Sequence, residues 1–166
     1  MTKKPIFVTE PFLPPLEEYT RLLREIWDNK IFTHNGPFVK KFEKEISKKL
    51  KIRNFISTTS GTTALQIAIK SLGLKGEVIT TPFSWIATIS AIKCEGCVPV
   101  FCDIEPDTFN IDPNKIEKCI TDKTVAIVPV HSFGNPCDID AIDFIAKKYN
   151  LKVVYDAAHS IGSTYK

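Results

Sequence analysis

The chain has 166 residues, of which 43% are hydrophobic and 25% are charged, and its formal net charge is +3. This balance is typical of a soluble globular protein with one packed core. No run approaches the roughly 18 consecutive apolar residues of a membrane-spanning helix. The N-terminal stretch "MTKKPIFVTEPFLPP" lacks the apolar segment of a secretion signal, and the five cysteines lack disulfide-framework spacing. We therefore expect a reduced, cytoplasmic protein with no membrane as partner.

The N-terminal third predicts two helices joined by a turn. Apolar residues recur at helical spacing from Leu16 to Trp27 and again from Phe38 to Leu50. Between them, Asn-Gly and Pro in "THNGP", residues 33–37, are typical of a turn.

The lysine-rich run 40–51 has two interpretations. It could be a basic patch for nucleic acid or a membrane surface. However, Phe42, Ile46 and Leu50 recur every four residues, which favours the solvated face of an amphipathic helix. We therefore expect no nucleic-acid partner.

From Asn54 onward, short apolar runs alternate with helical stretches. The predicted strands are "NFISTT" (54–59), "EVITT" (77–81), "VPVFCDI" (98–104), "TVAIVPVHS" (124–132) and "LKVVYD" (151–156). The predicted helices are "TTALQIAIKSLG" (62–73), "SWIATISAIKCEG" (84–96), "PNKIEKCI" (113–120) and "DIDAIDFIAKKYN" (138–150). Asp138 is a candidate N-cap for the last helix. This alternation predicts an α/β fold, a mostly parallel sheet flanked by helices on both faces.

Ligands of open α/β sheets bind beyond the carboxyl ends of the strands, so the residues that follow each strand are the candidate site. These segments are "TSGTT" (59–63), "PFSW" (82–85), "HSFGN" (131–135) and "DAAH" (156–159). They contain most of the polar and aromatic residues with site-like chemistry.

Gly61, Thr62 and Thr63 join a predicted strand to a predicted helix. Glycine allows close approach of a ligand, and the helix start offers unpaired N–H groups and a positive dipole end. The segment suits a phosphate, although it is neither a Walker loop nor a Gly-x-Gly-x-x-Gly motif. The alternative is an ordinary helix N-cap.

Three further residues have both a structural and a functional interpretation. Trp85 is either a core aromatic or a flat wall for a planar ring. Asp156 ends an apolar strand, so its carboxylate needs a partner, either in a salt bridge or in a cationic ring nitrogen of a cofactor. His159 is either structural or a partner for a neighbouring ring substituent. His131 follows a strand and could line the same cleft, but nothing in the sequence assigns it a role.

"CEGC", residues 94–97, has metal or redox spacing but no second pair. The three histidines share no metal-ligand spacing. We expect no metal site.

A phosphate turn, an aromatic wall and an acid after a later strand occur here in the order of a pyridoxal phosphate site. The chain resembles the sugar aminotransferases of the DegT/DnrJ/EryC1/StrS group, through these segments: "NGPFVKKFEKEI", "TTSGTTALQIAI", "GEVITTPFSWIATISAI", "GCVPVFCDIEPDTFNID", "VHSFGNPCDIDAI" and "VVYDAAHSIGSTYK". The resemblance implies the large domain of the fold type I, aspartate aminotransferase-like architecture.

The resemblance also implies residue roles. Gly61, Thr62 and Thr63 match the phosphate-binding turn, and Trp85 matches the aromatic residue that stacks on the cofactor ring. Asp156 matches the acid paired with the pyridine nitrogen. His159 lies where many members have a Gln that bonds the phenolic oxygen of the cofactor. An imidazole can also donate a hydrogen bond there, but whether it does depends on the protonation state of His159.

One part of the family pattern is missing. The lysine that binds the cofactor covalently is expected on the order of 25–30 residues past the acid. Lys166 matches a different lysine, that of the family's "YK". The chain therefore resembles the N-terminal part of a longer protein and is expected to be inactive by itself.

The resemblance implies, for the whole protein, transfer of an amino group from glutamate to a nucleotide-linked keto sugar, with a dTDP-linked 4-keto-6-deoxyhexose expected. Such enzymes serve polysaccharide or O-antigen biosynthesis and work as homodimers. One alternative is a sugar 3-dehydratase of the same family, with His in place of the lysine; "DAAH" favours the aminotransferase. Another is a non-catalytic binding fragment. We expect residues 1–53 to form an N-terminal helical segment and residues 54–166 to form part of the cofactor-binding large domain.

Overall fold

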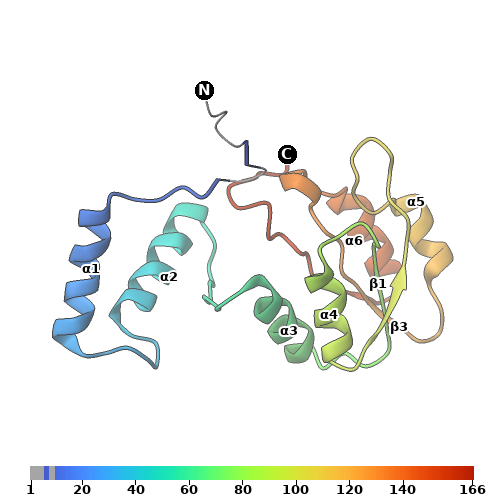
Figure 1. Ribbon diagram of the computed structural model, residues 1–166. Coiled ribbons are helices and arrows are strands. Elements are labelled where there is room, and N and C mark those ends of the chain that lie inside the picture. The colour runs from blue at the N-terminus through green and yellow to red at the C-terminus, as the bar shows by residue number, and fades with distance from the viewer. Residues whose placement is uncertain (1–5, 8–9) are drawn as a thin grey trace. The chain divides into compact units, whose positions relative to one another are not determined.

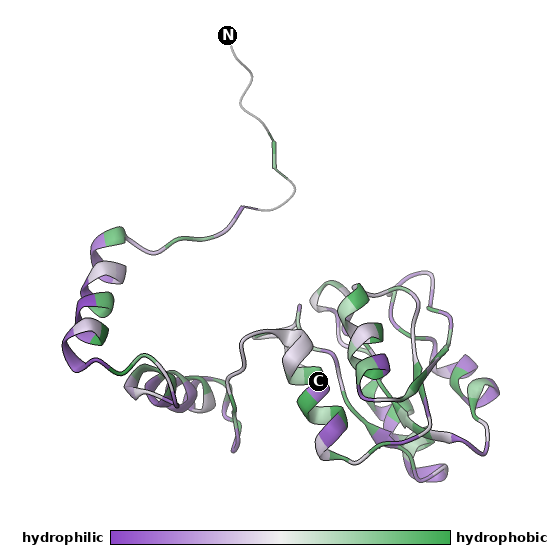
Figure 2. Ribbon diagram, turned by 60° about the horizontal axis from the view of Figure 1, so that its bottom comes forward, coloured by the Kyte–Doolittle hydropathy of each residue, from purple (hydrophilic) through white to green (hydrophobic). Residues whose placement is uncertain are grey.

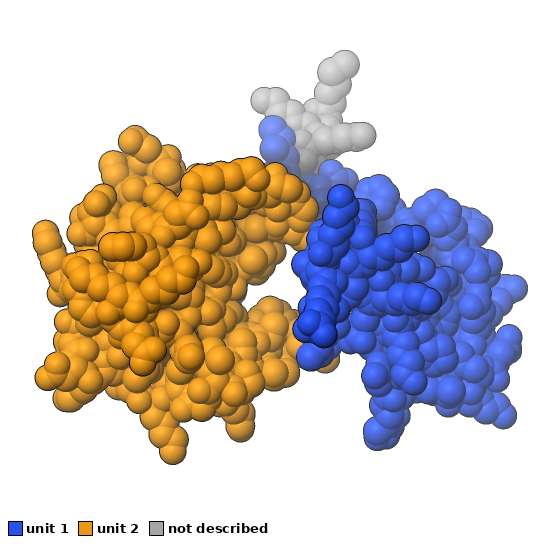
Figure 3. Space-filling model, turned by 180° about the vertical axis from the view of Figure 1, so that it is seen from behind, with its two compact units in different colours: residues 1–57 blue, residues 58–166 orange. Residues whose placement is uncertain are grey.

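The computed structural model describes residues 6–7 and 10–166. Part of the stretch considered for a secretion signal, residues 1–5 and 8–9, lies outside the described residues. The chain divides after Ser57 into two compact units, which Figure 3 colours separately. Within the described ranges, no helix has both the length and the apolar character needed to cross a bilayer.

The first unit contains the two predicted helices, α1 (Leu16–Asn29) and α2 (Pro37–Leu50), which confirms the helical periodicity. Both ribbons carry hydrophobic and hydrophilic residues (Figure 2). The turn between them is also confirmed, with His34 and Asn35 at φ 60° and 59°. After α2, the chain is held to that helix by Ser57, whose backbone N–H and hydroxyl both donate to Glu43.

The second unit contains a parallel sheet with the strand order β2-β1-β3-β4. The strands are β1 (Glu77–Thr80), β2 (Val98–Phe101), β3 (Thr124–Ile127) and β4 (Lys152–Val153). The helices are α3 (Gly61–Ser71), α4 (Ile86–Cys94), α5 (Pro113–Ile116) and α6 (Ile139–Lys148), with short 3-10 turns η1 (Glu117–Cys119) and η2 (Ser132–Gly134). Figure 1 shows these elements around the strands. The prediction of an α/β fold with a parallel sheet is confirmed.

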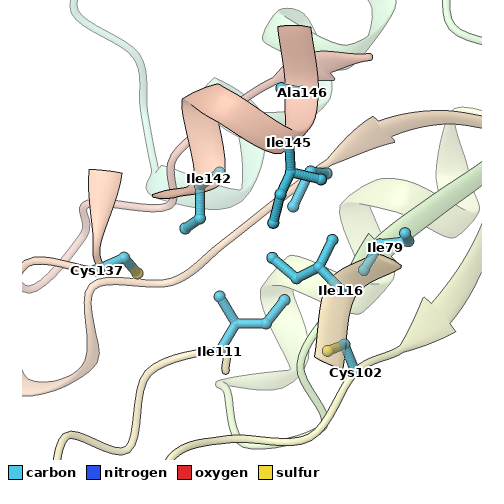
Figure 4. Close-up of a cluster of buried hydrophobic side chains, with 9 residues drawn as sticks. Ile79, Cys102, Ile111, Ile116, Cys137, Ile142, Ile145 and Ala146 are labelled. Atoms are coloured by element: carbon cyan, nitrogen blue, oxygen red, sulfur yellow. The ribbon is translucent and has the colours of Figure 1, made fainter. Parts of the chain in front are cut away.

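Helices cover both faces of the sheet because strand side chains alternate in direction. Val78 of β1 and Ala126 of β3 pack with Leu65 and Ile69 of α3 and with Ile92 of α4. The neighbouring residues of the same strands, Ile79 and Ile127, point to the opposite face. There they pack with residues of α5, α6 and the adjoining loops, all labelled in Figure 4: Cys102, Ile111, Ile116, Cys137, Ile142, Ile145 and Ala146. All of these residues are buried.

The start of α6 confirms a cap predicted from the sequence. The carboxylate of Asp138 accepts a hydrogen bond of 3.0 Å from the backbone N–H of Ala141. This bond satisfies one of the N–H groups that a helix start leaves without an internal partner.

The prediction of a strand at 54–59 is wrong. The structure gives this segment no strand, because an extended segment needs a neighbour to pair with and no strand of the described chain pairs with it. The other four predicted strands are all shorter in the structure than expected. β3 ends at Ile127, two residues before Pro129, which has no N–H to donate. Val130 and Asp156 nevertheless form an isolated parallel bridge, which extends the pairing of β3 and β4 toward the site.

Candidate functional site

A cavity of about 200 Å³ lies in the second unit, at the carboxyl ends of the strands. Its lining comes from the starts of α3 and α4 and from the segments that follow β3 and β4: Gly61, Thr62, Leu65, Ser84, Trp85, Ala87, Val130, Asp156, Ala158 and His159. Five of the six residues selected from the sequence are in this set. The structure thus brings together residues from positions 61 to 159.

The sixth residue, Thr63, is not among the lining residues. Its backbone N–H donates to the hydroxyl of Ser60, the N-cap of α3, at 3.2 Å, and its own hydroxyl lies 3.1 Å from that of Ser60. Thr63 therefore takes part in the cap of the helix. The N-cap interpretation is confirmed for Ser60 and Thr63, while Gly61 and Thr62 line the cavity.

Packing within the protein does not require a glycine at position 61, which lines the cavity. Its φ is outside the left-handed region, and a Cβ at this position would lie at an ordinary contact distance of 3.9 Å from Cβ of Ala158. The backbone would therefore tolerate a side chain. The free space lies at the start of α3, where N–H groups and the helix dipole favour an anion, so the arrangement fits a phosphate group.

Trp85 is the N-cap residue of α4 and is 76% exposed. The alternative interpretation of a core aromatic is wrong, because a core side chain would be covered. The exposed indole lines the cavity, where it offers a flat apolar surface to a planar ring.

Asp156 is only 8% exposed, and its two carboxylate oxygens are bonded separately. Oδ2 accepts a hydrogen bond of 2.7 Å from the hydroxyl of Thr88, and Oδ1 accepts one of 3.2 Å from the backbone N–H of Ala158. Within residues 6–7 and 10–166, no Lys or Arg forms an ion pair with it. A carboxylate has about four acceptor positions, so Asp156 can still accept a proton-bearing nitrogen. A buried carboxylate without a cation fits a ligand that brings one.

His131 lies beside Asp156, and the structure does not place it among the residues that line the cavity. Its backbone N–H donates to the carbonyl of Asp156 at 3.0 Å, and its ring stacks on Tyr155 with centroids 5.0 Å apart. Its Nδ1 accepts from the backbone N–H of Cys137, so the ring proton is on Nε2. Burial lowers the pKa of His131 below its ordinary value, and the negative charge of Asp156 opposes this shift.

A second cavity of about 270 Å³ adjoins the first and shares Ser84, Trp85, Val130 and His159 with it. Its distinct wall is aromatic. Phe83 and Phe133 line it, and their rings contact each other and that of Phe109, which lies outside the lining, at centroid distances of 5.5–6.2 Å. The exposed residue His159 thus lines both cavities.

The sequence interpretation missed Thr88 and Ser84. Thr88 is fully buried, and its hydroxyl lies 2.7 Å from that of Ser84 as well as from Asp156. The available signal was a threonine in the mostly apolar helical run "WIATISAI", since a hydroxyl buried there needs a partner.

The two cysteines of "CEGC" have different environments in the structure. Cys94 is exposed, whereas Cys97 is buried and its thiol points to the carbonyl of Leu74. The described chain contains no group of three or more His, Cys, Asp or Glu residues with metal-binding geometry. Lys166 is ion-paired with Asp140 on the surface and does not line the cavity.

The proteins to which this chain is similar include aminotransferases of one family. The sequence model of the DegT/DnrJ/EryC1/StrS aminotransferase family matches residues 16–166. The chain is 55% identical over 160 residues to a dTDP-4-amino-4,6-dideoxy-D-glucose transaminase of Shigella dysenteriae, covering 96% of this chain and 44% of that protein. It is 47% identical over 166 residues to a transaminase of the same name from Escherichia coli, covering all of this chain and 45% of the relative. The chain thus spans less than half the length of these relatives.

Among solved structures, the chain is similar to NtdA from Bacillus subtilis, which was crystallised with bound cofactor PMP. The two have a TM-score of 0.86 and 40% sequence identity, and the match covers 96% of this chain and 39% of NtdA.

Proposed function

The chain belongs to the DegT/DnrJ/EryC1/StrS aminotransferase family, and from this premise we propose that the whole protein is a pyridoxal phosphate-dependent sugar aminotransferase. It moves an amino group from glutamate to a nucleotide-linked keto sugar. The observation that carries the proposal is the buried, cation-free carboxylate of Asp156, which lines one cavity together with Gly61 and Trp85.

The residues of this cavity fit pyridoxal phosphate. Gly61, Thr62 and the start of α3 would hold the phosphate, and Trp85 would cover the ring. The carboxylate of Asp156 would accept from the ring nitrogen. An imidazole N–H of His159 could donate to the ring hydroxyl oxygen. Thr63 contributes indirectly, through the cap that shapes the helix start.

The bound cofactor supplies an electron sink for the pair released when a Cα–H bond breaks. The task of Asp156 in this chemistry is to keep a proton on the ring nitrogen. Its burial helps, because a charge pair is stronger where water is excluded. Trp85 shields one face of the ring from solvent. The group that moves the substrate proton is expected to be a lysine in the part of the protein that follows Lys166.

The proposed acceptor is a dTDP-linked 4-keto-6-deoxyhexose. The names of the two relatives support it, since both are transaminases of dTDP-4-amino-4,6-dideoxy-D-glucose. Glutamate as donor and a role in polysaccharide or O-antigen biosynthesis follow from the family resemblance.

Three further parts of the proposal concern the setting of the enzyme. We propose a homodimer in a reducing cytoplasm, where the five cysteines stay free, as they are in the structure. We also keep the assignment of residues 1–53 to an N-terminal helical segment and of residues 54–166 to the cofactor-binding large domain.

The experiment is a reaction of the full-length protein with pyridoxal phosphate, glutamate and the dTDP-linked keto sugar. Formation of 2-oxoglutarate and the amino sugar in equal amounts is expected. Asp156→Asn should abolish most of this activity, while Asp122→Asn, which replaces an exposed carboxylate, should leave it intact.

Two outcomes contradict the proposal. Loss of the sugar's 3-hydroxyl without amine incorporation points to the dehydratase branch of the family. Failure of the full-length protein to bind pyridoxal phosphate refutes both enzyme assignments and leaves a binding protein.

A further inference from the structure

Thr88 occupies an unusual position for a polar side chain. It is fully buried in the first turn of α4, three residues after Trp85, and its backbone N–H donates to the carbonyl of Trp85 at 3.2 Å. A helical threonine hydroxyl commonly bonds to a carbonyl of its own helix. Here the hydroxyl instead reaches Asp156, 68 residues later in the chain, at 2.7 Å.

The direction of the hydrogen bonds follows from counting protons. An ionised carboxylate only accepts, so the single hydroxyl proton of Thr88 points to Oδ2 of Asp156. The oxygen of Thr88 is then an acceptor for the hydroxyl of Ser84, which lies 2.7 Å away. The other acceptor available to Ser84, the carbonyl of Trp85, is more distant at 3.3 Å. The proton order is therefore Ser84 to Thr88 to Asp156.

These bonds determine the plane of the Asp156 carboxylate. Thr88 holds Oδ2 from α4, and the backbone N–H of Ala158 holds Oδ1 from the segment after β4. With one donor on each oxygen, the carboxylate resists rotation. Its remaining lone pairs are left for the cavity that Asp156 lines. A bond from a hydroxyl to an ionised carboxylate is also stronger than one between neutral groups.

Resting on the function proposed above, we propose that Thr88 is the positioning residue for the cofactor-facing acid: its hydroxyl orients Asp156 toward the ring nitrogen of pyridoxal phosphate. Because Thr88 lies three residues after Trp85 at the start of α4, the same helix end carries the aromatic wall and bonds the acid. Ser84 supports Thr88 by donating to it.

The test compares Thr88→Val, which keeps the shape and removes the hydroxyl, with Thr88→Ser, which keeps the hydroxyl. For the full-length wild type and both variants, dissociation constants are measured for pyridoxal phosphate and for an analogue in which a C–H group replaces the ring nitrogen. The analogue keeps the phosphate, aldehyde and ring hydroxyl, so only the contact with Asp156 differs.

We expect Thr88→Val to weaken the binding of pyridoxal phosphate about tenfold, the scale of one hydrogen bond to a charged group, and to leave the affinity for the analogue within about twofold. Thr88→Ser should restore the wild-type preference for pyridoxal phosphate over the analogue. A variant that is merely less well folded would lose affinity for both ligands equally, so the ratio of the two constants separates positioning from stability.

An unchanged ratio in Thr88→Val overturns the inference while the wild-type protein still binds the cofactor. Failure of the wild-type protein to bind pyridoxal phosphate overturns the proposed function, and the positioning role with it. The two failures are therefore distinguished by the wild-type measurement alone.

Discussion

Gly61 and Ala158 both line the cavity, and a Cβ added to Gly61 would lie at a contact distance of 3.9 Å from Cβ of Ala158. Gly61 is thus a glycine that the protein's own packing does not demand. A ligand that approaches the start of α3 would demand it, because a methyl group would occupy the path of that ligand.

Gly61→Ala is therefore expected to change stability and binding in opposite directions. The folded protein should be unchanged or more stable by about 0.5–1 kcal/mol, since alanine reduces the entropy of the unfolded chain. The affinity for pyridoxal phosphate should fall at least about tenfold. Urea unfolding and a cofactor titration measure the two effects.

Lys70→Ala, on the exposed side of the last turn of α3, is the control and should leave cofactor affinity unchanged. If Gly61→Ala binds pyridoxal phosphate as tightly as the wild type, the turn is not the phosphate site.

The stability of the protein should fall as the pH is lowered from 7.5 to 5.5, in part because of His131. Burial lowers the pKa of His131 in the folded state. The unfolded chain therefore takes up a proton near the ordinary histidine pKa of about 6.5, before the folded chain does. The stabilising contribution is present above that pH and is lost below it.

His131→Asn tests this sign, because an amide oxygen can replace Nδ1 as acceptor for the N–H of Cys137. The free energy of unfolding, measured with urea at pH 7.5 and 5.5, should fall less in the variant than in the wild type. An equal fall in both proteins would show that His131 contributes nothing to the pH dependence.

The five thiols should differ widely in their rates of alkylation. Burial is the main cause that raises the pKa of Cys102 to about 12 and that of Cys137 to about 12. Cys94, in contrast, is exposed. Since the thiolate is the reactive form, the thiols of Cys102 and Cys137 should react roughly a thousandfold more slowly at pH 7.5 than an ordinary exposed cysteine.

Iodoacetamide labelling followed by peptide mapping measures these rates, with guanidinium-unfolded protein as the control in which all five thiols react. Rapid labelling of Cys137 in the folded protein would contradict its burial in the core between η2 and α6.

Gly76 is a position where the backbone itself excludes a side chain. Its φ is +147°, and an added Cβ would lie 2.4 Å from the carbonyl oxygen of Lys123. Gly76→Ala should destabilise the protein by about 2–4 kcal/mol, because both the backbone angle and the close contact oppose it.

Gly73→Ala is the matched control. It also has a positive φ, +62°, but nothing lies within 4 Å of its added Cβ. It should cost only about 1 kcal/mol, the cost of the left-handed conformation alone. Equal losses in the two variants, measured by thermal and urea unfolding, would argue against the steric contact.

Local patterns in the sequence were enough to predict much of this structure. The spacing of apolar residues predicted α1 and α2, and the position of Asp138 predicted the cap of α6. The rule that ligands bind beyond the carboxyl ends of parallel strands selected the segments 82–85 and 156–159, which contribute residues to the cavity. The segment 59–63 also contributes, although the strand predicted before it is absent. These features depend on residues a few positions apart, so they can be read from one segment at a time.

The prediction of a strand at 54–59 was wrong because a strand needs a partner strand to pair with. The sequence of one segment does not show which other segment will lie beside it. The role of Thr88 was missed for the same reason, because its partner, Asp156, lies 68 residues away in the sequence. By itself, the sequence determined the alternation of strands and helices and the acid at position 156. Only the tertiary structure decided that Thr88 meets Asp156, that Thr63 turns to Ser60, and that Trp85 is exposed. The physical reason is that these contacts depend on the order of the strands and on the packing of α3 and α4 against them, which join residues far apart in the chain.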